Sequence, residues 1–160
     1  MKRRFAFIII GIVLVLTHRG QLLRAQTISL TGSWTLTIDV SNLIGGPGTD
    51  LTDTYESAAN QIVIDVSATG NTSWRVDVRK SDITWPGQFH LDVRRTGNGT
   101  GNGTVSGGLT YQEITSTDTE FYQGTKKREN VPVQLRLRGV SVSVVPNTYI
   151  TTVYYTVVRL

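Results

Sequence analysis

The chain has 160 residues and no cysteine, which excludes disulfide bonds, thiol catalysis, cysteine-ligated metals and lipid attachment through a cysteine. Sixteen Lys and Arg against twelve Asp and Glu give a formal net charge of +4. Five of the sixteen basic residues and none of the acidic ones lie within residues 1–25, so residues 26–160 carry 11 basic and 12 acidic side chains, a net charge of −1 that gives no support for a nucleic-acid partner.

The N-terminal residues have the pattern of a secretory signal peptide. Basic residues at positions 2–4 precede an uninterrupted apolar run at 5–16, which is too short to span a bilayer. We predict cleavage after Ala25, a small residue that the alternating pattern of the domain follows directly. The expected organisation is a signal peptide, residues 1–25, and one domain, residues 26–160, in an exported protein that is periplasmic, on the cell surface or extracellular. After cleavage we expect no integral membrane segment; an uncleaved signal anchor is the alternative.

From residue 27 onward the hydrophobic residues follow the period of a β-strand. The alternation over 27–40 predicts one half-buried strand, or two collinear strands that break near Gly32. Residues 41–60 interrupt the alternation and predict a long loop, with one short helical turn near 55–59. Alternation returns at 62–67 and 74–79, and the short turn between these segments predicts a hairpin.

The second half of the chain continues with short strands and turns. The glycine-rich tract at 96–108 predicts a flexible loop or a wide turn. Strands are expected at 89–94, 109–115, 121–122, 131–137 and 149–158. Seven to nine short strands without a convincing helix predict an all-β fold, an antiparallel β-sandwich of the immunoglobulin-like or pilin-like type.

The candidate catalytic residues do not form a recognised motif. His90 is the one histidine in residues 26–160 and lies on the polar side of a strand, which disfavours a catalytic triad or a zinc site. Asp77, Asp82 and Asp92 each lie near Arg or Lys, so cross-strand charge pairing is favoured over glycoside hydrolysis. We therefore expect a protein that is not an enzyme, with no catalytic residue, no metal and no cofactor.

Whether one acidic loop binds a cation is left open by the sequence. Asp50, Asp53 and Glu56 are spaced three residues apart in a glycine-rich segment, where carboxylates can approach a hard cation. The spacing does not match the alternating oxygen ligands of a calcium loop, so a solvated acidic loop is favoured.

The three tryptophans divide into core and surface candidates. Trp34 and Trp74 occupy the apolar phase of their strands and are expected in the core. Trp85 precedes Pro86 in a turn, where it is a candidate platform for stacking on a glycan ring. An alternative function is therefore a secreted module that binds glycans or a protein partner through its long loops.

The first and last strands of the domain are candidates for pairing between molecules. Residues 149–158 have apolar, Tyr or Thr side chains in both alternating rows, so both faces are expected to be buried or partnered. Extended terminal segments of this kind take part in strand exchange between subunits. The candidate strand-pairing residues are Ile28, Leu30, Tyr149, Val153 and Tyr155.

The closing sequence YITTVYYTVV and the preceding GVSVSVVPNTY, in an exported domain of this size, resemble secreted bacterial β-sandwich subunits of the fimbrial and spore coat protein U type. The resemblance covers roughly the last quarter of the chain. It implies a non-catalytic structural role with assembly by donor-strand complementation. The chain departs from many of those subunits in lacking a cysteine pair. We therefore expect a secreted or cell-surface structural subunit that adds β-strands to form a fibre or coat, with itself or other surface subunits as partners.

Overall fold

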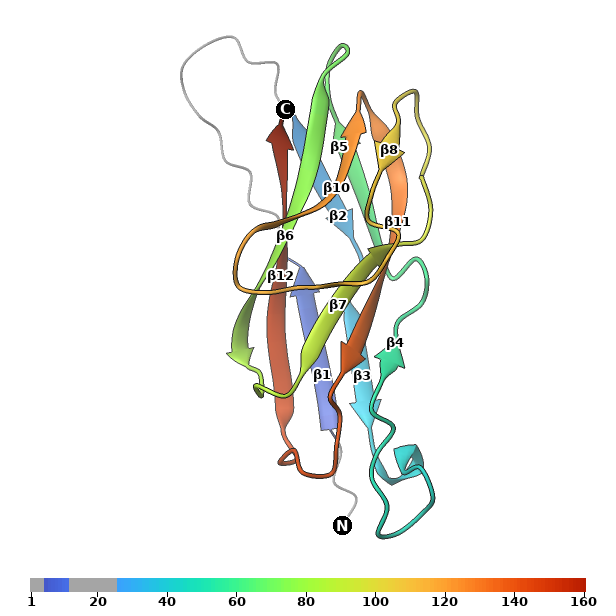
Figure 1. The fold of residues 1–160 in the computed structure, drawn as a ribbon, viewed down its shortest axis with the longest axis vertical. Helices are drawn as coiled ribbons and strands as arrows, with labels where there is room; N and C mark the ends of the chain where they lie inside the picture. Colours follow the sequence, from blue (N-terminus) through green and yellow to red (C-terminus); the bar gives the residue numbers. More distant parts are fainter. Residues whose placement is uncertain (1–4, 12–25) are drawn as a thin grey trace.

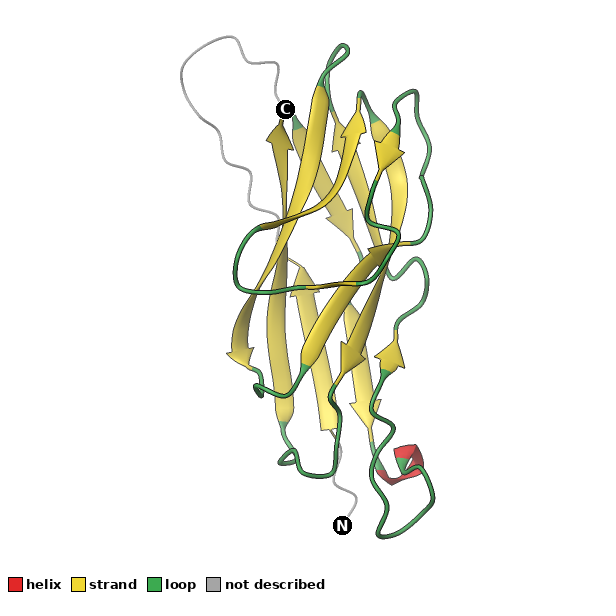
Figure 2. Cartoon of the chain, in the orientation of Figure 1, coloured by secondary structure: helices red, strands yellow, loops and turns green. Residues whose placement is uncertain are grey.

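The computed structural model describes residues 5–11 and 26–160, and for residues 5–11 it describes the backbone alone. Apart from one 3-10 turn, η1 (Val40–Asn42), the regular elements are strands (Figure 2). No helix in these two ranges has the length and apolar character needed to cross a membrane. The strands are β1 (Phe5–Gly11), β2 (Thr27–Thr31), β3 (Trp34–Ile38), β4 (Tyr55–Glu56), β5 (Ile62–Ser67), β6 (Ser73–Thr84), β7 (His90–Arg95), β8 (Val105–Ser106), β9 (Gln112–Glu113), β10 (Thr119–Thr125), β11 (Arg128–Arg138) and β12 (Thr148–Arg159).

The strands form two sheets that pack against each other (Figure 1). The first sheet has the order β3-β1-β12-β6-β10-β8, and the second has the order β2-β5-β11-β7-β9, with β4 also paired to β11. Every strand pair is antiparallel except β1 with β12. The predicted antiparallel β-sandwich is confirmed. The described residues contain twelve strands rather than seven to nine, and β4, β8 and β9 have only two residues each.

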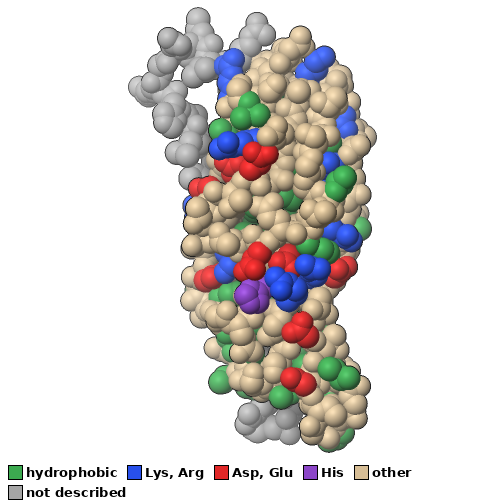
Figure 3. Space-filling view, in the orientation of Figure 1, with side chains coloured by type: hydrophobic (Ala, Val, Ile, Leu, Met, Phe, Trp, Pro, Cys, Tyr) green, Lys and Arg blue, Asp and Glu red, His purple; other side chains and the backbone are tan. Residues whose placement is uncertain are grey.

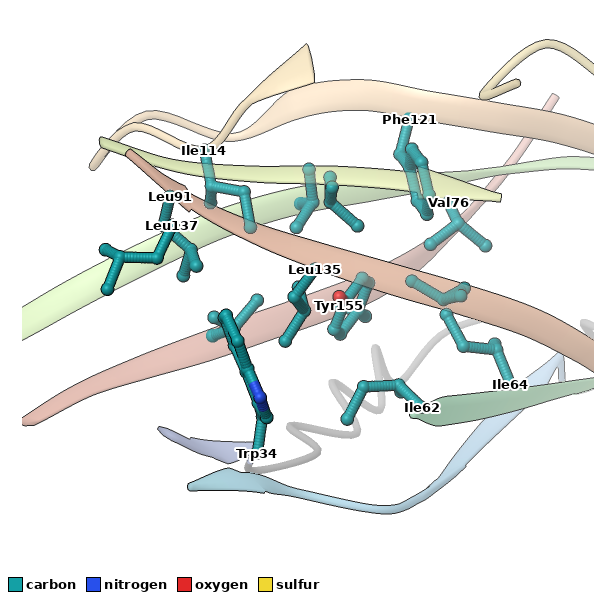
Figure 4. Close-up of a cluster of buried hydrophobic side chains, with 14 of the residues drawn as sticks. Trp34, Ile62, Ile64, Val76, Leu91, Ile114, Phe121, Leu135, Leu137 and Tyr155 are labelled. Carbon is teal, nitrogen blue, oxygen red and sulfur yellow. The ribbon is translucent and has the colours of Figure 1, made fainter. Parts of the chain in front are cut away.

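The core lies between the sheets and consists of the inward rows of the strands (Figure 4). Trp34 and Trp74 are buried there, as predicted, with 7% and 0% of their surface exposed. Leu135 and Leu137 from β11 approach the same interior from the second sheet. Each fully buried large apolar side chain contributes roughly 1.5–3 kcal/mol, so such a core stabilises a domain that has no disulfide bond.

Gly32 separates β2 from β3 and allows the chain to change sheets. Its φ angle is +117°, and a Cβ atom at this position would lie 2.1 Å from the carbonyl oxygen of Gln61. Only glycine fits such a conformation at such a close approach. The predicted break near Gly32 is therefore correct, but the two strands belong to different sheets.

The predicted hairpin between residues 62–67 and 74–79 is wrong. These segments form β5 and β6, which lie in opposite sheets: β5 pairs with β2 and β11, and β6 pairs with β10 and β12. Alternation shows which face of a strand is buried but does not specify its neighbour. Here the neighbours come from distant parts of the chain, and both strands still direct their apolar rows into one core.

The helical turn predicted near residues 55–59 is also wrong. Tyr55 and Glu56 form β4, opposite Leu137 and Arg136 of β11. Ser57 continues this attachment, since its backbone N–H donates to the carbonyl oxygen of Leu135 and its Oγ accepts from the Leu135 N–H, both at 2.9 Å. The backbone of residues 55–57 therefore pairs with β11 instead of forming a local helical turn.

The glycine-rich tract at 96–108 is a loop over most of its length, as predicted, but it contains the two-residue strand β8 and packs against the connection between β10 and β11. Gly99, Gly101 and Gly103 alternate along it, and Cβ atoms there would lie 2.3, 2.6 and 1.7 Å from carbonyl oxygens within residues 125–129. The glycines are therefore required for close backbone packing. The prediction of a flexible loop overlooked this contact.

Two buried arginines donate hydrogen bonds to backbone carbonyl oxygens of the same loop. The Arg128 guanidinium donates to the carbonyl oxygens of Asn98 at 2.6 Å and Gly103 at 2.7 Å. Arg95 donates to the carbonyl oxygen of Gly107 at 2.8 Å. Because a guanidinium has five N–H donors in a fixed plane, each arginine satisfies several loop carbonyls at once.

Candidate functional site

Strand β1 is inserted between β3 and β12 in the first sheet (Figure 1). It runs antiparallel to β3, with Phe5 opposite Ile38 and Ile9 opposite Trp34. It runs parallel to β12, from Ala6 opposite Thr148 to Gly11 opposite Val153. We call the place between β3 and residues 148–153 of β12 the slot. Its occupant comes from the segment that the sequence predicts to be removed on export.

The residues that border the slot alternate between an inward row, which is apolar apart from Thr151, and an outward row, in which Thr152 is also buried. On β3, Trp34 and Ile38 are buried, whereas Thr35 between them is exposed. On β12, Tyr149 and Val153 are buried. A strand that fills the slot therefore has one face against the apolar core and the other toward solvent.

The structure places only part of the predicted pairing residues at this slot. Tyr149 and Val153 border it, whereas Tyr155 lies beyond the end of β1 and is buried in the core. Ile28 and Leu30 belong to β2, an edge strand of the second sheet that pairs with β5. Their role in pairing between molecules stays a prediction.

Sequence reasoning did not identify β1 as part of this site, and in the opening strand it named Ile28 and Leu30 rather than the residues of β3. Residues 5–11 are almost uniformly apolar, and such a run is typical both of a signal peptide and of a fully buried strand. Periodicity does not separate these two possibilities. The assignment of residues 1–25 to a signal peptide stays a prediction, and most of that segment, residues 1–4 and 12–25, lies outside the described residues.

Strand β12 is held in place largely from its other side. It pairs with β6 from Ile150 to Arg159. Thr151 is fully buried, and its hydroxyl contacts Asp82 Oδ1 at 2.7 Å and the carbonyl oxygen of Ser81 at 3.2 Å. The position of this side of the slot therefore does not depend on β1.

Trp85, the predicted glycan platform, packs partly against the end of the sandwich. Its indole N–H donates to the carbonyl oxygen of Phe89 at 3.0 Å, and the two rings meet edge to face at 5.4 Å. The Lys80 Nζ atom lies 5.6 Å from the centre of the indole. The indole N–H is thus used within the domain, and glycan binding at Trp85 stays a prediction.

The acidic loop that contains Asp50 and Asp53 is hydrogen-bonded to the loop at residues 139–142. Asp50 accepts hydrogen bonds from the Val142 N–H at 2.8 Å and the Ser141 hydroxyl at 3.1 Å. Asp53 accepts from the Gly139 N–H at 3.1 Å. Backbone hydrogen bonds lower the pKa of Asp50 and keep it ionised. Within residues 5–11 and 26–160, no three His, Asp or Glu side chains are grouped in a way that would hold a metal ion.

A charged cluster covers the middle of the face drawn in Figure 3. Asp92 is buried and accepts from Arg136 at 2.8 Å and Arg138 at 2.6 Å. His90 contacts Glu113 at 2.8 Å. Burial raises the pKa of Asp92, but the hydrogen bonds and positive charges of the two arginines outweigh it and leave this pKa below its ordinary value. An ionised carboxylate between two arginines is not suited to general acid catalysis.

The other two candidate acids are also paired with basic side chains. Asp77 contacts Arg75 at 3.0 Å, and Asp82 contacts Lys80. Both pairs join residues two positions apart on one strand, whereas Asp92 pairs across strands as predicted.

Comparison of the sequence with protein family models and with curated proteins finds no match. Function has to be inferred from the geometry of the chain itself.

Proposed function

We propose that this protein is a non-catalytic structural subunit of an extracellular or cell-surface fibre or coat, and that it associates with neighbouring subunits by β-strand addition at the slot. The observation that supports the proposal is the place of β1. It fills an interior position of a sheet, yet it comes from residues 1–25, the segment predicted to be cleaved.

Loss of this segment would leave two strand edges without partners. β3 would lose the only strand with which it pairs among the described residues, and β12 would lose one of two. Unpaired N–H and C=O groups along a strand are a template for another strand. The buried residues beside the slot, Trp34, Ile38, Tyr149 and Val153, would also lose their paired neighbours on β1. Addition of a strand from another subunit satisfies both the backbone and the core.

Export and assembly of the protein with matched variants on β3 test this proposal. The chain is expressed with its own N-terminus in a bacterial host, and the exported product is studied by mass spectrometry, light scattering and electron microscopy. We expect a product that begins at Gln26 and forms oligomers or fibres. Leu36→Arg places a charge in the inward row of the slot and should abolish assembly, whereas Thr35→Arg alters the outward row and should preserve it.

Two results would contradict the proposal. One is a processed product that remains strictly monomeric at all concentrations. The other is an assembly that Leu36→Arg leaves intact. Circular dichroism of both variants shows whether the sandwich itself is retained.

A further inference from the structure

The pairing of β1 shows how assembly at the slot could be delayed until the N-terminal segment is lost. Building on the proposed function, we infer that residues 5–11 are a temporary occupant: they complete the sheet within one chain, and their removal opens the slot to a strand from another subunit. The chemistry of the slot also defines that strand as extended and uncharged, with large apolar side chains at alternate positions.

The first reason is that, among the described residues, β1 pairs with only part of the β12 edge. It pairs with Thr148–Val153, whereas β12 extends to Arg159. A longer strand that runs in the same direction as β1 would make more hydrogen bonds along β12 and displace β1.

The second reason is that the two edges bordering the slot carry no protective charge. β3 reads WTLTI and residues 148–153 of β12 read TYITTV, without any Asp, Glu, Lys or Arg. Natural edge strands commonly use charged residues, prolines or bulges to prevent pairing with other chains. Edges without a charge need a permanent or temporary cover, and in this chain β1 provides it.

The third reason is that the edges differ in how firmly they are held. β12 is anchored to β6, including the contacts of Thr151, and keeps its place. β3 joins the first sheet through β1, while Trp34 and Ile38 fix it to the core. Release of β1 thus leaves one fixed edge and one edge attached through two buried side chains, and an incoming strand would bind between them.

A disulfide lock on the full chain tests this inference, because the chain has no cysteine that would interfere. A protease recognition sequence is introduced within residues 12–25 of the full chain. Ile8→Cys with Thr35→Cys joins β1 to β3 at directly opposite positions. The matched control, Thr27→Cys with Ser67→Cys, joins β2 to β5 at opposite positions in the other sheet. Mass spectrometry follows the cut segment, and light scattering follows association.

We expect the uncut chain to be monomeric and the cut, unlocked chain to release its N-terminal segment and associate. The cut chain with the β1–β3 lock should stay monomeric until a reductant is added, whereas the control lock should have no effect. Equal association with and without the β1–β3 lock would overturn the inference. The proposed function would then still stand, but the subunits would associate through another strand edge. Association of the uncut chain to the same extent would also overturn it.

A second experiment, with a synthetic peptide, distinguishes failure of this inference from failure of the proposed function. A synthetic peptide of residues 5–11 with flanking lysines is added to the cut, unlocked chain. Binding of the peptide without self-association would support the slot as a strand site and reject self-assembly. Failure of the peptide to bind a chain that has released its own segment would overturn the inference.

Discussion

Asp92 is a buried carboxylate on the second sheet, and its ion pairs with two arginines contribute to the stability of the domain. Its side chain is 2% exposed, and the guanidinium groups of Arg136 and Arg138 supply the charge that burial requires. Breaking one side of such a group leaves buried charge without compensation, which costs more than the intact group contributes. The carboxylate is therefore a structural residue rather than a catalytic one.

Asp92→Asn should destabilise the domain by about 3 kcal/mol at neutral pH, because the amide removes the negative charge between the two arginines and replaces one acceptor oxygen by an NH2 donor. Since the folded state lowers the pKa of Asp92, its contribution is present above the unfolded value of about 4 and is lost as the pH falls through the lower, folded value. Urea unfolding at pH 7 and at pH 3 checks this, and the difference between variant and wild type should shrink at pH 3. Asp118→Asn, at a more exposed carboxylate beside Arg79, is the control and should change stability by less than about 0.5 kcal/mol.

At the scale of elements, the loop at 96–108 shows that composition alone misjudges order. Its glycines lie against backbone oxygens, and Arg95 and Arg128 bind its carbonyl groups. The sequence pattern that signals this is the spacing of Gly97, Gly99, Gly101 and Gly103 at every second residue, which is the period of an extended segment with one face against a neighbour.

Gly103→Ala should destabilise the domain by about 2 kcal/mol, because the added Cβ would lie 1.7 Å from the Thr125 carbonyl oxygen and force the backbone to move. Gly87→Ala is the matched control: nothing lies within 4 Å of the added carbon, so the change should be less than about 0.5 kcal/mol. Thermal unfolding of both variants decides the point. Equal effects would show that the loop does not pack closely on residues 125–129.

At the scale of the molecule, β1 connects the two terminal parts of the domain. It joins β3, near the start of the domain, to β12 at its end, and β12 in turn pairs with β6. Loss of one strand from the interior of a sheet removes backbone pairing on two sides, at a cost of about 5 kcal/mol or more, which is a large share of the net stability of a domain. A strand that fills the slot therefore contributes a large share of the stability of the sandwich.

Two peptides test the face that the slot presents. In the β1 register, positions 5, 7 and 9 lie opposite Ile38, Leu36 and Trp34, the inward row of β3, and directly opposite residues share a face. A lysine-flanked peptide of residues 5–11 with serine at positions 6, 8 and 10 should bind the cut chain and raise its melting temperature. The peptide with serine at 5, 7 and 9 should do neither, and equal binding would contradict the alternating slot.

The sequence predicts the features of this protein that depend on neighbouring residues better than those that depend on contacts between distant segments. Alternation over residues 27–40 and 74–79 correctly indicated strands with Trp34 and Trp74 in the core, because the direction of a side chain is a local property of an extended backbone. For residues 149–158 the strand was predicted correctly, but both rows were expected to be buried or partnered, whereas the structure buries the row that contains Tyr149 and Val153 and leaves most of the other row half-buried. Local patterns do not select neighbours. The separation of β5 from β6 and the position of β1 between β3 and β12 were decided only in the tertiary structure, where backbone groups and apolar rows from distant segments are satisfied together.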